Sequence, residues 1–194
     1  MSNQAPSIEA TWAGPFSWPK FEEKNDLPPI PKSPGVYLQT FEYDDGYLIY
    51  AAGLTQRSVL KRFREHTRHF MNGGYTVLDM QAIKKGIRKE IWHGWGYARE
   101  HPEEFEENKS RILEAVQEQL SAYRIFVADV GTRKRILERL EAAVMDKLYQ
   151  SPSPFCDIPD EGMQLSPRWD TEKPILVQNR CEANIHRLPP VLQI

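Results

Sequence analysis

Hydrophobic and polar residues around position 40 follow the pattern of two neighbouring β-strands. The first β-prone run spans Val36 to Phe41, and the second spans Tyr47 to Ala51. Between them lies Asp44-Asp45-Gly46, a composition typical of the tight turn that joins two antiparallel strands. The pattern therefore predicts a β-hairpin over residues 36–51.

A helical spacing of apolar residues follows this hairpin. Val59, Phe63 and Phe70 recur at intervals that place them on one face of a helix. Thr55 stands where a capping residue is expected, and the Asn72-Gly73-Gly74 cluster predicts the end of the helix. The sequence therefore predicts that a helix directly follows the second strand.

Two further helices, a third strand and a closing helix are expected after residue 75. Residues 76–91 and 104–121 favour helices, the second of them amphipathic. The apolar run 123–130 is typical of a buried strand. Thr132 is placed to cap a last helix that extends through Leu148.

The two ends of the chain lack this periodicity. Residues 1–33 mix aromatic residues with prolines and predict an extended lead-in, while the proline-rich tail adds at most an edge strand and loops. We therefore expect an α+β fold with a small three-stranded antiparallel sheet flanked by helices. Its domain would cover residues 34–155 with a helical insert at 71–121, and residues 156–194 would pack on it as a C-terminal extension.

Length and composition indicate a globular protein. The 194 residues are 40% hydrophobic and 27% charged, and no apolar stretch approaches the roughly 18 residues of a membrane span. We therefore expect no membrane partner. With two cysteines and no secretory pattern at the start, the sequence predicts a cytoplasmic protein.

Charge is distributed unevenly, although the net charge is only -2. Between residues 54 and 89 there are nine basic residues against two acidic ones, whereas residues 100–118 hold seven glutamates against two basic residues. A basic run of this kind is either a solvated helix face or a surface that binds nucleic acid. The candidate nucleic-acid-binding residues are Arg57, Lys61, Arg64, Arg68, Lys84, Lys85, Arg88 and Lys89.

Three short motifs occur in a meaningful order. Gly35-Val36-Tyr37 opens the hairpin, Tyr50-Ala51-Ala52-Gly53 closes it, and the following helix carries Arg62 and His66. With Glu141 in the last helix, this order resembles the GIY-YIG nucleases. Two departures are an inserted alanine in the second motif and Cys156 after Pro154-Phe155, where the family often has asparagine.

The resemblance implies a GIY-YIG-like nuclease domain over residues 34–155, with Tyr37, Tyr50, Arg62, His66 and Glu141 as its catalytic residues. Because Arg62 and His66 are four residues apart, they share one helix face, where a guanidinium can grip phosphate and an imidazole can relay a proton. The alternative for His66 is an ordinary residue on the helix surface. The tyrosines would act as the base or position the water, with Tyr37 favoured by the resemblance, or would only pack across the strands.

Glu141 lies at the edge of the apolar stripe of its helix, where a carboxylate needs a partner. A hard cation, Mg²⁺ or Mn²⁺, would provide one, and the resemblance implies that Glu141 is its ligand. The alternative is an ion pair with Arg133 or Lys147. No zinc-ligand spacing, phosphate-binding loop or dinucleotide motif occurs. The aromatic residues between 92 and 97 either fill the core or stack on bases.

These observations predict a metal-dependent endonuclease that hydrolyses DNA phosphodiester bonds. A restriction-type and a repair-type role both fit, as do a monomer and a homodimer, and the expected partner is double-stranded DNA. The alternative is a nuclease-fold module that binds nucleic acid without cleaving it, because two motif positions depart from the family pattern.

Overall fold

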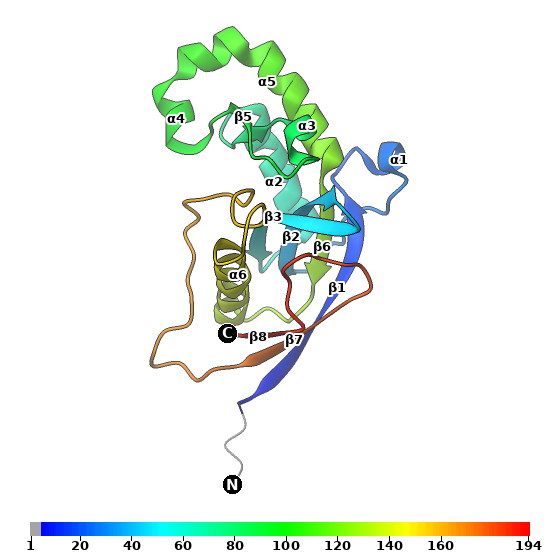
Figure 1. Cartoon of the computed structure of the whole chain (residues 1–194), viewed down its shortest axis with the longest axis vertical. Coiled ribbons are helices and arrows are strands. Elements are labelled where there is room, and N and C mark those ends of the chain that lie inside the picture. Colours follow the sequence, from blue (N-terminus) through cyan, green and yellow to red (C-terminus); the bar gives the residue numbers. More distant parts are fainter. Residues whose placement is uncertain (1–4) are drawn as a thin grey trace.

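A six-stranded mixed sheet forms the centre of the fold (Figure 1). The computed structural model describes residues 5–194. The strands run in the order β3-β2-β6-β1-β7-β8, and all neighbours are antiparallel except β1 and β7. Their bounds are Ser7–Ser17 for β1, Gly35–Tyr43 for β2, Gly46–Thr55 for β3, Arg124–Ala128 for β6, Leu176–Cys181 for β7 and Val191–Gln193 for β8.

The prediction of a small three-stranded sheet is therefore wrong. The hairpin of β2 and β3 is confirmed, and β6 lies beside β2 as the third strand, but the sheet continues past β6 and curls. The additional strands come from the two ends of the chain. Residues at both ends thus supply half of the strands in the central sheet.

Strand β1 corrects the prediction that the first residues form only an extended lead-in. Ala10 and Trp12 are buried and Thr11 between them is exposed, which is the alternation of a half-buried strand. The prolines concealed this pattern. The ladder between β1 and β6 shifts register between Ala13 and Phe16, and this irregularity accommodates Pro15 inside a paired strand.

The tail also differs from its prediction. Residues 176–181 form β7, which is paired on both sides, and of the two strands in the tail only β8 lies at an edge of the sheet. β7 could not be recognised locally because its parallel partner, β1, is about 170 residues away in the sequence. Long-range pairing therefore decides the structure of both chain ends.

The helices match the predictions in part. Helices α2 (Val59–Met71), α5 (Pro102–Ala122) and α6 (Lys134–Tyr149) are present. The predicted caps are wrong: Ser58 caps α2, since Thr55 belongs to β3, and Arg133 precedes α6 without a side-chain cap. The remaining helices are short: α1 (Glu22–Asn25), α3 (Met80–Ile83) and α4 (Trp95–Glu100).

The predicted helix over residues 76–91 is also wrong. The segment forms β4 (Val77–Leu78), the four-residue helix α3 (Met80–Ile83) and β5 (Glu90–Trp92), and β4 pairs with β5. Asp79 accepts hydrogen bonds from Gln81 and Ala82 and so starts a new short helix in the middle of the segment. Gly86, with a φ of 70°, then turns the chain back toward β5.

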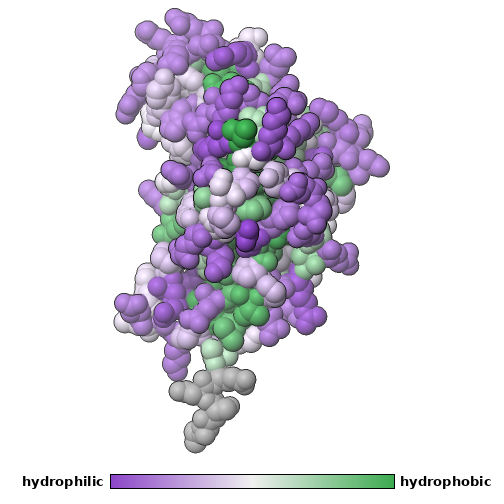
Figure 2. Space-filling model, in the orientation of Figure 1, coloured by the Kyte–Doolittle hydropathy of each residue, from purple (hydrophilic) through white to green (hydrophobic). Residues whose placement is uncertain are grey.

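Helices cover both faces of the sheet. On one face, α2 and α5 enclose an aromatic core that includes Trp18, Phe63 and Tyr123. On the other face, α6 packs against the sheet around a second core that includes Leu140 of α6 and Val177 of β7. Figure 2 shows hydrophilic residues over most of the face viewed there, with small hydrophobic areas between them. Among residues 5–194, no helix has the length and apolar character that crossing a membrane requires.

Candidate active site

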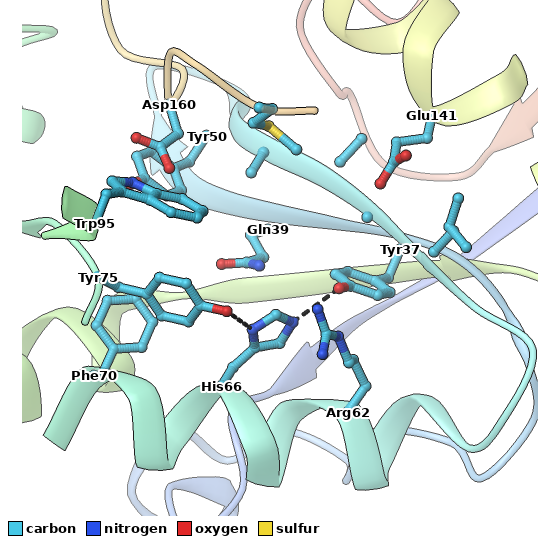
Figure 3. A pocket seen from close by; sticks show the side chains of 15 residues that line it. Tyr37, Gln39, Tyr50, Arg62, His66, Phe70, Tyr75, Trp95, Glu141 and Asp160 are labelled. Carbon is cyan, nitrogen blue, oxygen red and sulfur yellow. Dashed lines mark hydrogen bonds between the residues drawn. The ribbon is translucent and has the colours of Figure 1, made fainter. Parts of the chain in front are cut away.

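A cavity of about 310 Å³ lies beside β3, which is one of the two edge strands of the sheet. We call it the β3 pocket. Because β3 is an edge strand, α2 reaches the pocket from one face of the sheet and α6 reaches it from the other (Figure 3). Its lining includes all five residues singled out from the sequence: Tyr37, Tyr50, Arg62, His66 and Glu141. The structure therefore brings these five residues together in one cleft, while their roles remain predictions.

A β-bulge explains how the inserted alanine is accommodated. Gln39 pairs with Ala51 and the next residue, Thr40, pairs with Ile49, so Tyr50 has no partner in the ladder. An extra residue in a regular strand would turn Tyr50 to the opposite face from Gly53. The bulge absorbs that residue, and Tyr50 packs in the same core as Tyr37.

Gly53 is needed because the Tyr37 ring lies directly on it. A Cβ atom at position 53 would come within 3.0 Å of the ring carbons and the hydroxyl of Tyr37. Tyr37 has no room to retreat, because its ring also packs against Phe63, with 4.9 Å between the ring centroids. Gly53 thus fixes where the Tyr37 hydroxyl lies in the pocket.

A chain of hydrogen bonds runs from Tyr37 through His66 to Tyr75. The Tyr37 hydroxyl lies 2.8 Å from His66 Nε2, and His66 Nδ1 lies 3.0 Å from the Tyr75 hydroxyl. His66 is only 6% exposed, so the alternative of a surface histidine is wrong. Burial, together with the positive Arg62, lowers the pKa of His66 to about 3. The imidazole is therefore neutral at neutral pH, with one ring nitrogen donating and the other accepting.

The two tyrosines are protonated at neutral pH. Burial raises the pKa of Tyr37, and the nearby Arg62 guanidinium opposes this shift without cancelling it. Burial also raises the pKa of Tyr50 well above its ordinary value. Neither phenol can therefore act as a base at neutral pH without a group that lowers its pKa. Both are suited to donating a hydrogen bond.

Glu141 is a desolvated carboxylate without a basic partner. Burial raises its pKa to about 7, Glu138 adds to the shift, and Arg62 opposes it. Among the described residues, no cationic group lies within the 4.0 Å of an ion pair, so the alternative pairing with Arg133 or Lys147 is not formed. Glu138 does pair, with Lys134 at 3.2 Å and Arg135 at 3.5 Å.

These features fit a single divalent cation at Glu141. The carboxylate lines the β3 pocket, is largely removed from water, and faces Arg62 across the cavity (Figure 3). Within residues 5–194 no group of three or more His, Cys, Asp or Glu side chains is arranged to hold a metal. A cation here would therefore keep several waters, as Mg²⁺ commonly does.

The two shifted groups give the free energy of unfolding opposite pH dependences. The pKa of Glu141 is raised from 4.5 to about 7, so this residue destabilises the fold increasingly as the pH rises between those values. The pKa of His66 is lowered from 6.5 to about 3, so this residue destabilises the fold increasingly as the pH falls between those values. The two effects oppose each other between about pH 4.5 and 6.5.

The other end of the pocket contains residues that sequence reasoning missed. Asp160 donates its backbone N–H to Tyr50 O at 3.0 Å, and its carboxylate lies 3.5 Å from Arg88 Nη2. Burial raises the pKa of Asp160, whereas Arg88, the Tyr50 hydroxyl and the Trp95 indole oppose the shift. Gln39 is the one missed residue with a sequence signal, a polar residue two positions after Tyr37 in an apolar strand.

The predicted basic residues fall into different groups. Lys61, Arg64 and Arg68 are exposed, and at about 100° per residue they lie on the face of α2 opposite His66. Lys84 and Lys85 are exposed beyond the end of α3. The remaining three are paired within the protein: Arg57 with Glu65, Lys89 with Asp79, and Arg88 with Glu90, Asp160 and the carbonyls of Ile158 and Pro159.

Comparison with known proteins assigns no family to this geometry. No family model, no curated protein and no solved structure matches the chain. The resemblance to the GIY-YIG nucleases therefore stays a prediction from the motifs.

Proposed function

We propose that the chain is a metal-dependent endonuclease that hydrolyses phosphodiester bonds in DNA. The observation that supports this most strongly is that Arg62 and Glu141 face each other across one pocket without forming an ion pair. The Tyr37 hydroxyl lies in the same pocket. A guanidinium and a carboxylate-bound cation can both stabilise the negative charge that develops in a phosphoryl transition state.

Arg62 is the phosphate-binding residue in this account. Its guanidinium pairs with Glu65, with 3.4 Å between Arg62 Nη1 and Glu65 Oε2, and lies beside the Tyr37 hydroxyl at the pocket wall (Figure 3). The side chain remains 37% exposed, so it is accessible to a phosphate that enters from solvent. A planar guanidinium can grip two phosphate oxygens and stabilise the charge that accumulates on them.

Glu141 would hold the cation, and the hydrogen-bonded chain would position the water. A bound Mg²⁺ supplies charge neutralisation and makes a water more acidic. The Tyr37 hydroxyl is fixed by Gly53 and His66, so it is suited to orienting the attacking water rather than to removing its proton. The water oxygen bonds to phosphorus as the ester P–O bond breaks, the water loses a proton, and the leaving sugar oxygen gains one.

The exposed basic face of α2 would follow the DNA backbone. Lys61, Arg64 and Arg68 are positively charged and unpaired to any described acidic residue within 4.0 Å. Phosphate contacts of this kind release counterions, so binding should weaken steeply with added salt.

The test is cleavage of supercoiled plasmid DNA in Mg²⁺ and in EDTA. We expect nicked and linear products with wild type in Mg²⁺ alone, and none with Arg62→Ala. Salt-dependent binding without cleavage would identify the inactive binding module instead. Equal cleavage by wild type and Arg62→Ala would contradict the site assignment.

A further inference from the structure

The end of the β3 pocket that lies away from Glu141 is lined with aromatic rings. Trp95, Tyr75 and Phe70 all line it, and in Figure 3 they lie on the opposite side of the cavity from Glu141. The centroids of Trp95 and Tyr75 are 5.4 Å apart, and those of Phe70 and Tyr75 are 5.1 Å apart. With Gln39, these residues form what we call the base pocket.

Trp95 adopts a backbone conformation that is unfavourable for a large side chain. Its φ is 58°, in the left-handed region, and the residue is 45% exposed. Two neighbours hold it there: Trp95 N donates to Gly74 O at 2.8 Å, and Gly94 fits against the backbone of Tyr75 and Thr76 where a Cβ would not. Strain that places an exposed aromatic ring at a pocket is typical of binding sites.

Gln39 offers a hydrogen-bonding amide inside the same cavity. It is 8% exposed, and the structure gives its side-chain amide no hydrogen-bond partner among the described residues. Figure 3 shows the amide between the aromatic rings and Tyr37. Because this amide faces the cavity and has one donor and one acceptor group, it suits a ligand that brings both a donor and an acceptor. The edge of a nucleobase does so.

We propose that the base pocket binds one unpaired nucleobase of the nucleic acid whose neighbouring phosphate lies between Arg62 and Glu141. This inference rests on the proposed function and names its substrate class. Aromatic rings bind the face of a base, and Gln39 contacts its edge. A base inside a duplex is stacked and paired, so the substrate must be single-stranded at that nucleotide or must turn it out of the helix.

The test measures binding in EDTA, where the bound strand stays intact. The probe is a fluorescein-labelled single-stranded DNA octamer and a series in which one abasic nucleotide is moved along it. We expect wild type to lose affinity by roughly tenfold at one position of the abasic nucleotide, because stacking on a protein aromatic has about that effect. The other positions should change affinity little.

Variants assign this effect to the base pocket. Trp95→Gly removes the ring and suits the positive φ, so the protein should fold and should bind the normal and abasic strands equally. Trp95→Phe and the control Trp169→Ala, which alters an exposed tryptophan outside the pocket, should keep the discrimination. Gln39→Met should keep the preference for a base over an abasic nucleotide but reduce the differences among the four bases.

Three outcomes would overturn the inference. They are equal wild-type affinity for every abasic strand, discrimination that survives in a folded Trp95→Gly protein, and binding of free nucleoside monophosphates as tight as that of the octamer. Plasmid cleavage separates this inference from the nuclease proposal. Base-dependent binding without Mg²⁺-dependent cleavage would contradict the nuclease proposal alone, and cleavage without base dependence would contradict the base pocket alone.

Discussion

Replacing Gly53 by alanine tests how the pocket is held together. The added Cβ would come within 3.0 Å of the Tyr37 ring, which is 2% exposed and packed against Phe63. Forcing an extra methyl into such a contact costs about 1–3 kcal/mol. Moving Tyr37 also breaks its 2.8 Å hydrogen bond to His66, which costs about 0.5–1.5 kcal/mol more. We therefore expect a loss of about 1.5–4.5 kcal/mol in the free energy of unfolding.

Urea denaturation measures this loss, and Gly96→Ala is the matched control. Gly96 lies in α4 with no heavy atom within 4 Å of an added Cβ, so the control should keep or raise stability, by up to about 1 kcal/mol. Among folded molecules, displacing Tyr37 should lower Mg²⁺-dependent cleavage by roughly 100-fold. Wild-type stability and cleavage in Gly53→Ala would refute the claim that Gly53 positions Tyr37.

Three other predictions follow from charges in and around the pocket. Urea denaturation should show Glu141→Gln and wild type to be about equally stable at pH 4. By pH 8 the variant should be the more stable of the two, by at most about 3 kcal/mol in the free energy of unfolding. A flat difference would contradict the raised pKa of Glu141. Arg62→Ala should lower kcat by at least about 100-fold, whereas Arg64→Ala on the outer face of α2 should leave kcat unchanged and weaken DNA binding. Arg88→Ala should destabilise the fold by about 2–4 kcal/mol because it strands the Asp160 carboxylate, and an unchanged melting temperature would refute that role.

Local patterns predicted the part of the sheet that positions the site. The two β-prone runs around residue 40 and the turn at residues 44–46 are enough to define the hairpin, since both strands and their turn are contiguous in sequence. The hairpin carries Tyr37 and Tyr50, and the four-residue spacing puts Arg62 and His66 on one face of the next helix. All four side chains line the same cavity beside β3.

Non-local pairing accounts for most of what the sequence did not predict. β1 and β7 are stabilised by partners distant in the sequence, and neither strand has a turn signal that ties it to its neighbour. The helix expected at residues 76–91 fails for a local reason, because the Asp79 side chain caps a new turn in the middle of that segment.

The sequence left open whether the aromatic residues between 92 and 97 fill the core or stack on bases. The structure separates them, because Trp92 is buried in the core whereas Trp95 is 45% exposed at the β3 pocket. Trp95 is distinguished from the buried Trp92 only by its left-handed backbone, which Gly94 and its packing impose. Asp160 reaches the pocket from a proline-rich loop through a backbone hydrogen bond to Tyr50. Neither feature is visible in hydrophobic periodicity.

The nuclease proposal is tested most directly by two neighbouring glutamates of α6. Glu141→Gln and the control Glu138→Gln are each assayed for Mg²⁺-dependent plasmid cleavage and, on the same preparation without metal, for melting temperature at pH 8. We predict that Glu141→Gln abolishes cleavage while its melting temperature stays equal or rises, because a desolvated carboxylate has been removed. Glu138→Gln should cleave like wild type. Full cleavage by Glu141→Gln, or no cleavage by wild type in Mg²⁺, would contradict the account.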